Sequence, residues 1–186
     1  MSAKKNQIVV RKPSEGKGLP DVHDALVERG FKPPFKLDLG CGNIKTKDHV
    51  GLDIVAVPQV DVVCNLEWGI PLRDNCVVAG VANQFFEHLH RDSVLPLIDE
   101  LHRVFQVGGI MRIMVPHYMG PYAWADPGHR VAFAEGYFLY LTPERGKQMF
   151  NVGRRRFWSV EKLEVKKEQH YGMMLPVLIT AHLKKI

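Results

Sequence analysis

The sequence predicts a doubly wound α/β domain, in which helices pack on a mostly parallel sheet. Short apolar runs alternate with segments of helical periodicity along most of the chain. The longest helical pattern covers 94–105, with apolar residues at i, i+3, i+4 and i+7, and Gly108-Gly109 is predicted to end it. Near the C-terminus, two segments alternate with period two, at 162–167 and 177–184, and predict an antiparallel hairpin with its turn near Gly172.

The predicted parallel strands are short apolar runs bounded by turn residues. They cover 35–39, 50–54, 60–66, 76–82 and 110–115. The run at 76–82 is almost continuously apolar, which is typical of a central strand covered on both faces. Helices are expected over 20–30, from Asp92 or Ser93 onward, and after Thr142. We also expect strand, helix and strand to alternate five times along the chain before the hairpin.

Length and composition indicate one globular domain. The chain has 186 residues, of which 46% are hydrophobic and 24% charged. Residues 1–18 are polar and basic, so we expect a disordered arm with Ile8-Val9-Val10 as a local exception, followed by a single domain over 19–186. The net charge of +5 is concentrated in this arm and in 154–156, which we interpret as a solvated tail and a basic loop rather than a nucleic-acid surface.

Other protein classes are not favoured by the sequence. No run of eighteen apolar residues is present, and the N-terminus lacks the apolar segment of a signal peptide, so we expect no membrane association. The three cysteines are Cys41, Cys64 and Cys76. Their odd number and the absence of C-x-x-C spacing argue against a disulfide framework or a zinc ribbon, and favour reduced thiols in the cytoplasm.

One stretch carries the functional signal: Lys36-Leu37-Asp38-Leu39-Gly40-Cys41-Gly42, followed by Asp53 at the end of the next predicted strand. A Gly-x-Gly turn after a strand lets a ligand approach backbone N–H groups. An ionised carboxylate one strand further on can accept two hydrogen bonds from a ribose diol. A dinucleotide fingerprint would need a third glycine, but Lys45 stands at that position, so NAD is not expected.

The motif resembles motif I of the class I S-adenosylmethionine-dependent methyltransferases, in their small type 11 branch. Further segments similar to that branch follow in order: Gly51 to Ile54, Asn65-Leu66 with Ile70-Pro71-Leu72, Phe86 to Leu89, Glu100 to Phe105 with Gly108-Gly109, Val115 to His117, and Asp126 to Arg130. The resemblance covers 35–140 and implies a seven-stranded, Rossmann-like methyltransferase sheet of strand order 3-2-1-4-5-7-6.

The same resemblance implies S-adenosyl-L-methionine as cofactor and a set of binding residues. Asp38, Gly40, Cys41 and Gly42 would line its methionine end, Asp53 its ribose, and Ile54, Asn65 and Leu66 its adenine, while Asn83 and Gln84 would face its amine. One departure is that 42–50 is too short for the full helix that usually follows the glycine loop. We therefore considered that Lys45 supplies part of the positive charge of the missing helix dipole, a solvated lysine being the alternative.

Four residues near the same sheet edge are candidate general bases for the acceptor: His88, His117, Asp126 and His129. Each has a structural alternative, because Glu87-His88 could cap a helix, His117 could brace the cofactor loop, and Asp126 could pair with His129 to fix their own loop. No two histidines have H-x-x-x-H spacing, so no metal site is predicted.

The acceptor itself is not encoded in a recognisable motif. No target-base motif follows Asn83, which favours a small-molecule or saccharide-like acceptor. Two alternatives remain: a nucleic-acid methyltransferase or accessory subunit that uses the basic arm, and a module that binds the cofactor without chemistry. The sequence does not predict an oligomeric state.

Overall fold

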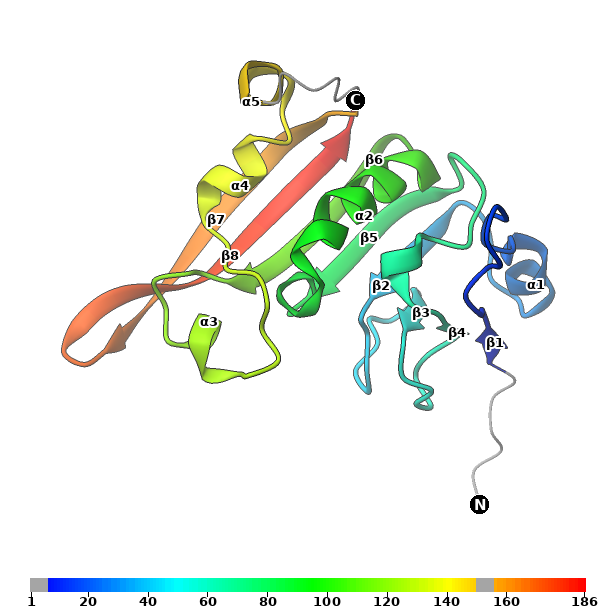
Figure 1. The fold of residues 1–186 in the computed structure, drawn as a ribbon, viewed down its shortest axis with the longest axis horizontal. Coiled ribbons are helices and arrows are strands. Elements are labelled where there is room, and N and C mark those ends of the chain that lie inside the picture. The colour runs from blue at the N-terminus through cyan, green and yellow to red at the C-terminus, as the bar shows by residue number, and fades with distance from the viewer. Residues whose placement is uncertain (1–6, 150–155) are drawn as a thin grey trace.

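The computed structural model describes residues 7–149 and 156–186, which form an α/β domain around one eight-stranded sheet (Figure 1). Its order is β1-β4-β3-β2-β5-β6-β8-β7. The strands are β1 (Ile8–Val9), β2 (Phe35–Leu39), β3 (Val50–Asp53), β4 (Val62–Val63), β5 (Val77–Asn83), β6 (Phe105–Pro116), β7 (Trp158–His170) and β8 (Met173–Lys185). All neighbours are parallel except β6 with β8 and β7 with β8.

The predicted sheet order is confirmed for the seven strands from β2 onward, and β1 adds an eighth at the edge. The local exception expected in the basic arm at Ile8-Val9-Val10 is confirmed, because Ile8 and Val9 pair with β4 and Val10 is buried. The Gln7 side chain also donates to the carbonyls of Val57 and Val60. Residues 1–6 lie outside the described part of the chain, and the domain boundary at residue 19 stays a prediction.

The predicted alternation of strands and helices is wrong for the second crossover, while the first lacks a helix as its short spacing indicated. The segments between β2 and β3 and between β3 and β4 contain turns and bends but no helix. The glycine loop therefore runs directly into β3, as the short spacing between Gly42 and Val50 predicted. β4 is also shorter than expected, because Leu66–Trp68 forms a 3-10 turn (η1) in which Asn65 Oδ1 accepts the Glu67 N–H.

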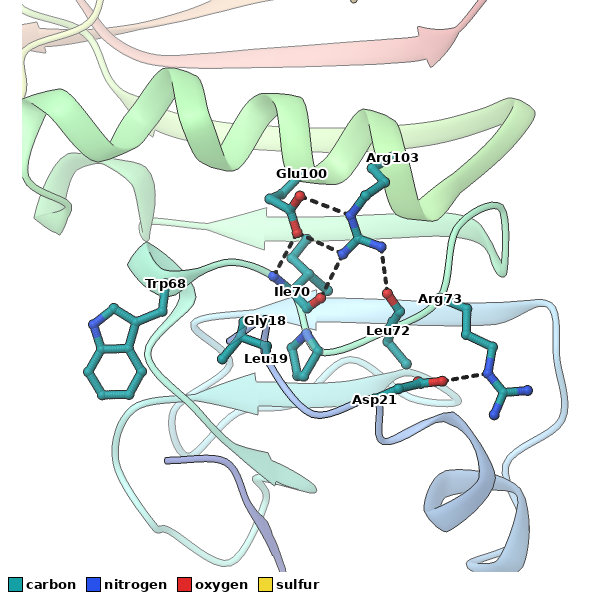
Figure 2. A pocket seen from close by; sticks show the side chains of 10 residues that line it. Gly18, Leu19, Asp21, Trp68, Ile70, Leu72, Arg73, Glu100 and Arg103 are labelled. Atoms are coloured by element: carbon teal, nitrogen blue, oxygen red, sulfur yellow. Dashed lines mark hydrogen bonds and ion pairs between the residues drawn. The ribbon is translucent and has the colours of Figure 1, made fainter. Parts of the chain in front are cut away.

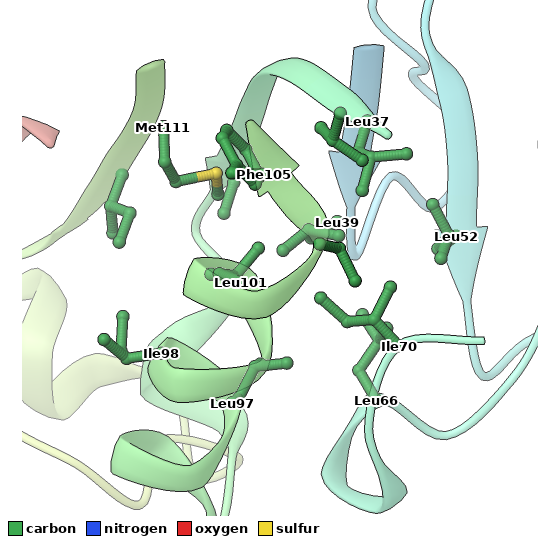
Figure 3. Close-up of a cluster of buried hydrophobic side chains, with 14 of the residues drawn as sticks. Leu37, Leu39, Leu52, Leu66, Ile70, Leu97, Ile98, Leu101, Phe105 and Met111 are labelled. Carbon is green, nitrogen blue, oxygen red and sulfur yellow. The ribbon is translucent and has the colours of Figure 1, made fainter. Parts of the chain in front are cut away.

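The longest helix, α2 (Arg91–Val104), covers one face of the sheet (Figure 1). Its buried face consists of Val94, Leu97, Ile98, Leu101 and Val104, as the periodicity predicted. Figure 3 shows Leu97, Ile98 and Leu101 facing side chains of β2, β3 and β6. The helix ends earlier than predicted, because Phe105 already begins β6 and Gly108-Gly109 lies inside that strand.

The other helices are short: α1 (His23–Glu28), a 3-10 turn η2 (Phe86–His88), α3 (Tyr122–Ala125), α4 (Glu135–Leu139) and α5 (Pro143–Met149). α4 lies along the β7–β8 hairpin on the same side as α2 (Figure 1). No helix among the described residues is both long and apolar enough to cross a bilayer.

Two residues of α2 hold the chain that precedes β5. Figure 2 shows Glu100 and Arg103 in direct contact with Ile70 and Leu72 in the wall of a cavity, which has a volume of about 400 Å³. The Arg103 guanidinium donates to both Glu100 oxygens at 2.9 and 2.7 Å and to the carbonyls of Leu72 and Ile70 at 2.7 and 2.9 Å. Glu100 also accepts the Ile70 N–H at 3.2 Å. Because these groups satisfy one another, this cavity is framed by a structural network.

Candidate functional site

Two cavities lie at the edge of the sheet where β2, β3, β4 and β5 end. The first, of about 380 Å³, is lined by Gly40, Asp53, Ile54, Cys64, Asn65, Leu66, Glu67, Gln84, Phe85, His88, Leu89 and Arg130. The second, of about 360 Å³, is lined by Asp38, Gly40, Cys41, Asn43, Ile44 and Asn83. Gly40 lines both cavities, so they adjoin at the glycine turn. This edge is where open α/β sheets bind their ligands.

The predicted cofactor residues gather here with two exceptions. Nine of the eleven line one of the two cavities. The exceptions are Gly42, whose N–H donates to Asp53 Oδ2 at 2.9 Å, and Lys45. Asp53 Oδ1 accepts the Val55 N–H, also at 2.9 Å. A carboxylate offers about four lone-pair positions, so each Asp53 oxygen keeps one for a ligand hydroxyl.

The sharp turn at Gly40 depends on the absence of a side chain. Gly40 has φ +63°, and a Cβ built there would overlap the ring of Phe85. Phe85 lines the larger cavity, so the glycine lets this ring form part of the wall. Sequence reasoning did not single out five lining residues: Cys64, Glu67, Phe85, Leu89 and Arg130. Leu89 and Arg130 each end a segment of the family resemblance, which was the available signal; Cys64, Glu67 and Phe85 had none.

The cysteine of the glycine turn is a neutral thiol. Burial raises the pKa of Cys41 to about 12, and the charges of Asp38 and Asp53 act in the same direction. Burial likewise raises the pKa of Cys64 to about 12. A nucleophilic thiolate is therefore not available at either position, and both residues serve as wall groups.

Lys45 is neither solvated nor directed into the two cavities. Its ammonium lies 2.5 Å from Asp61 Oδ2, and the Lys45 side chain is only 13% exposed. Asp61 is buried and also accepts the Gly51 N–H at 2.9 Å. The ion pair thus ties the loop after β2 to the start of β4, which accounts for the position of Lys45 better than the cofactor contact predicted from the sequence.

We expect Lys45→Met to lower the free energy of unfolding by about 1–3 kcal/mol, since the buried Asp61 carboxylate then keeps the Gly51 N–H and the more distant Arg29, at 3.5 Å, but loses its close cation. Affinity for S-adenosylhomocysteine, measured by calorimetry, should stay unchanged. Lys36→Met on the exposed side of β2 is the control for loss of a lysine. Weaker binding by a fully stable Lys45 variant would instead support the original cofactor contact.

The segment 126–129 lies beside η2. The backbone carbonyl of Glu87 accepts the N–H groups of Arg130 and Val131 at 2.7 and 3.2 Å. His88 Nδ1 lies 3.3 Å from the Gly128 carbonyl, and the rings of His88 and His129 meet edge to face at 4.7 Å between centroids. Two predicted candidate bases are therefore brought together, and His88 also lines the larger cavity.

Asp126 and His129 lie close to each other, with 3.9 Å between Asp126 Oδ2 and His129 Nε2. The other Asp126 oxygen accepts the Gly128 N–H at 2.7 Å, which fixes the turn. His129 Nδ1 faces the Ala123 carbonyl at 3.3 Å. Asp126 is therefore partly a loop brace, as the alternative interpretation proposed, and its free oxygen still points at an imidazole.

His117 does not join this group. Its Nδ1 accepts the Met119 N–H at 3.1 Å, so its Nε2–H donates to Glu135 at 3.1 Å. The ring is 3% exposed and lines neither cavity. With both nitrogens satisfied, His117 links the end of β6 to α4. This favours a structural role over the predicted role as a base, although its partners are not in the cofactor loop that the alternative named.

Glu87 is the most unusual carboxylate near the site. It is 1% exposed, and no atom meets hydrogen-bond geometry with either of its side-chain oxygens. Burial raises its pKa to about 7; the residue's own backbone N–H opposes this shift, and the charge of Asp126 adds to it. Buried polar groups without partners are rare, and they cluster at functional sites.

Comparison with known proteins supports the fold. No family model and no curated protein sequence matches this chain. Among solved structures, it is similar to a SAM-dependent methyltransferase from Archaeoglobus fulgidus (TM-score 0.53, 17% identity, covering 88% of this chain and 93% of that one). It is also similar to a SAM-dependent methyltransferase from Methanosarcina mazei (TM-score 0.56, 13% identity, covering 86% of this chain and 97% of that one). A third similar structure is that of the N-methyltransferase NodS from Bradyrhizobium japonicum with bound S-adenosyl-L-homocysteine (TM-score 0.56, 13% identity, covering 88% of this chain and 85% of that one). The chain therefore has the fold of the S-adenosylmethionine-dependent methyltransferases.

Proposed function

We propose that this protein is a methyltransferase that uses S-adenosyl-L-methionine and acts on a small-molecule or saccharide-like acceptor. The observation that carries the proposal is the convergence of nine residues, chosen from the motif resemblance, on two adjoining cavities at the carboxyl edge of the sheet. In this arrangement Asp53 binds the ribose hydroxyls, Ile54 and Leu66 border the adenine, and Asp38 and Asn83 lie toward the methionine end. The fold similarity to known methyltransferases supports the same cofactor.

Methyl transfer from a sulfonium is an in-line displacement, in which positioning and exclusion of water supply much of the acceleration. On this proposal, the acceptor lies against His88, because that side chain borders the larger cavity and joins it to the 126–129 segment. If the acceptor atom is a hydroxyl, a neutral imidazole nitrogen or a carboxylate is needed to take its proton. His88, His129 and Asp126 offer such groups.

The basic arm borders the adenine end of the site. Val10, Arg11 and Lys12 line a cavity of about 280 Å³ together with Ile54, Val63, Cys64, Asn65 and Trp68. We therefore propose that residues 10–12 of the arm cover the adenine end of the cofactor cavity. Retention on heparin that is lost on deletion of residues 1–18 would favour the alternative, a nucleic-acid methyltransferase.

The first test is binding and turnover by the purified chain. S-adenosylmethionine and S-adenosylhomocysteine should bind in calorimetry and NAD should not. Incubation of fractionated small-molecule and polysaccharide extracts with methyl-labelled cofactor should then give a labelled product. Binding of NAD, or of neither methionine-derived ligand, would overturn the proposal, and binding without transfer to any fraction would favour a non-catalytic module.

A second test addresses the ribose contact. We expect Asp53→Ala to weaken S-adenosylhomocysteine binding by about 2–3 kcal/mol, because it removes charge-assisted hydrogen bonds to the ribose. Glu28→Ala, on the exposed side of α1, controls for the loss of one negative charge. An Asp53 variant that melts as a folded protein and binds with unchanged affinity would rule out the ribose assignment.

A further inference from the structure

We propose that Glu87, His88 and His129 form a binding site for one divalent transition-metal ion at the acceptor side of the cavity. Each residue offers one ligand atom, and the three atoms lie within 4.8 Å of one another. In the described part of the chain this is the sole group of three histidine, cysteine, aspartate or glutamate side chains with such spacing. The sequence did not predict a metal, because the ligands come from two segments about forty residues apart.

The two segments are held in register by the backbone rather than by the ligands. The Glu87 carbonyl binds the N–H groups of Arg130 and Val131, which directly follow His129. The backbone therefore fixes the relative positions of the two segments that carry the ligands. This distinguishes the site from a chance group of exposed acidic residues, because the fold fixes its donors.

Both imidazoles have the tautomer that a metal needs. His88 Nδ1 faces the Gly128 carbonyl and His129 Nδ1 faces the Ala123 carbonyl, each at 3.3 Å. A carbonyl can only accept, so Nδ1 carries the proton in each ring and Nε2 keeps its lone pair. Metal-binding histidines usually donate their second nitrogen to a carbonyl or carboxylate, which fixes the ring orientation in this way.

Glu87 supplies the independent observation. Its side chain is 1% exposed, and neither carboxylate oxygen has a hydrogen-bond partner. Burying a carboxylate without a partner is costly, and such groups in proteins are normally paired or coordinate a metal. A cation between Glu87 and the two imidazoles would supply the missing partner. The partly exposed Asp126, 3.9 Å from His129 Nε2, lies where it can add a fourth ligand atom or, with both Nε2 atoms bound to the ion, remain as the base for the acceptor.

The donor set indicates the class of ion. Two imidazoles and one carboxylate suit Zn²⁺, Mn²⁺, Fe²⁺ or Co²⁺, whereas Mg²⁺ and Ca²⁺ prefer oxygen donors alone. Ligands at about 2.0–2.2 Å from an ion lie closer together than 4.8 Å, so binding must draw the side chains inward. The resulting open coordination positions face the cavity that His88 lines. Resting on the proposed function, we infer that acceptor oxygens occupy them, which selects acceptors with adjacent hydroxyls or carboxylates.

The test uses the full chain, stripped of metal with a chelator. Titration with Zn²⁺, Mn²⁺ and Co²⁺ in a calorimeter should give one ion per chain, and Co²⁺ should give a visible absorption spectrum of mixed nitrogen and oxygen ligation. His129→Asn and Glu87→Gln should each weaken binding by at least about 100-fold, more than the loss of an outer hydrogen-bond partner costs. His49→Asn is the matched control, since His49 Nδ1 also contacts a carbonyl, that of Lys47, but His49 is outside the group.

Glu87→Gln separates the ion site from a purely structural role. Without metal it should melt no lower than the parent protein, because it removes an unpaired buried charge, and it should lose the stabilisation that metal gives the parent. Absence of stoichiometric binding, or unchanged binding in both variants, would overturn the site. S-adenosylhomocysteine affinity, measured in parallel, tests the proposed function separately, since it does not require the ion.

Discussion

Replacing Gly40 with valine should abolish detectable binding of S-adenosylhomocysteine. The residue has φ +63°, where a β-branched side chain is strongly disfavoured, and any Cβ there meets the Phe85 ring. Because Phe85 is part of the cavity wall, relief of this overlap pushes the ring into the cofactor space. We expect affinity to fall by more than about 1000-fold, equivalent to about 4 kcal/mol.

Gly42 provides a control in the same loop. It also has positive φ, at +48°, but no atom lies within 4 Å of a Cβ built there. Gly42→Ala should therefore cost only the backbone penalty of about 1–2 kcal/mol in stability and leave affinity nearly unchanged. Gly40→Ala combined with Phe85→Ala should recover part of the binding lost in Gly40→Ala. Equal losses in the Gly40→Ala and Gly42→Ala single variants would contradict the role given to Phe85.

Replacing Arg103 with methionine should lower the free energy of unfolding by about 3–4 kcal/mol, since it leaves Glu100 and two carbonyls without their partner. The methionine keeps much of the apolar stem, so the measured loss reports the guanidinium. Arg73→Met is the control: Arg73 binds Asp21 and Asp24, but its side chain is 47% exposed. Because that network is exposed to solvent, its loss should lower stability far less than the loss of the Arg103 network.

The contribution of Arg103 to the free energy of unfolding should also depend on pH. Burial by itself raises the pKa of Glu100, but hydrogen bonds from Arg103 and the Ile70 N–H outweigh it, so the pKa is lowered overall. A lowered carboxyl pKa stabilises the fold above the pKa of the unfolded chain, and this is lost as pH falls through the folded value. The difference between parent and Arg103→Met in urea unfolding should thus shrink on acidification below about pH 4. A constant difference would argue against the ion pair as its source.

Strand positions could be predicted because each strand is a short apolar run between turns. The order of the strands in the sheet could be predicted because the resemblance to the methyltransferase family covers the segments that connect them. The crossovers without helices were predicted only where spacing excluded a helix, between Gly42 and Val50. The apolar run Ile8-Val9-Val10 marked an ordered exception in the arm, but its pairing with β4 could not be predicted, because no local pattern reveals which strand it joins. Gly108-Gly109 predicts a helix stop, but α2 already ends at Val104, because the next residue, Phe105, begins β6.

The cofactor residues could be predicted because they follow strands, and the carboxyl ends of parallel strands meet at one edge. Lys45 was assigned to the wrong environment, because its neighbour Asp61 lies two strands away in the sheet and sixteen residues along the chain. Glu87 was considered only as a cap, since sequence shows neither its burial nor its lack of partners. His88 and His129 lie together because the 126–129 segment turns back toward η2. The sequence indicates a turn in this segment but does not indicate which way the turn points.

The carbonyl of Glu87 has a consequence for how the acceptor side opens. It is the common acceptor for the N–H groups of Arg130 and Val131, so neither amide can be released to solvent without moving the 126–131 segment away from η2. In hydrogen–deuterium exchange the two amides should therefore exchange together, with one opening rate. The same opening would also break the contact between His88 Nδ1 and the Gly128 carbonyl, so the 126–131 segment should open as one cooperative unit.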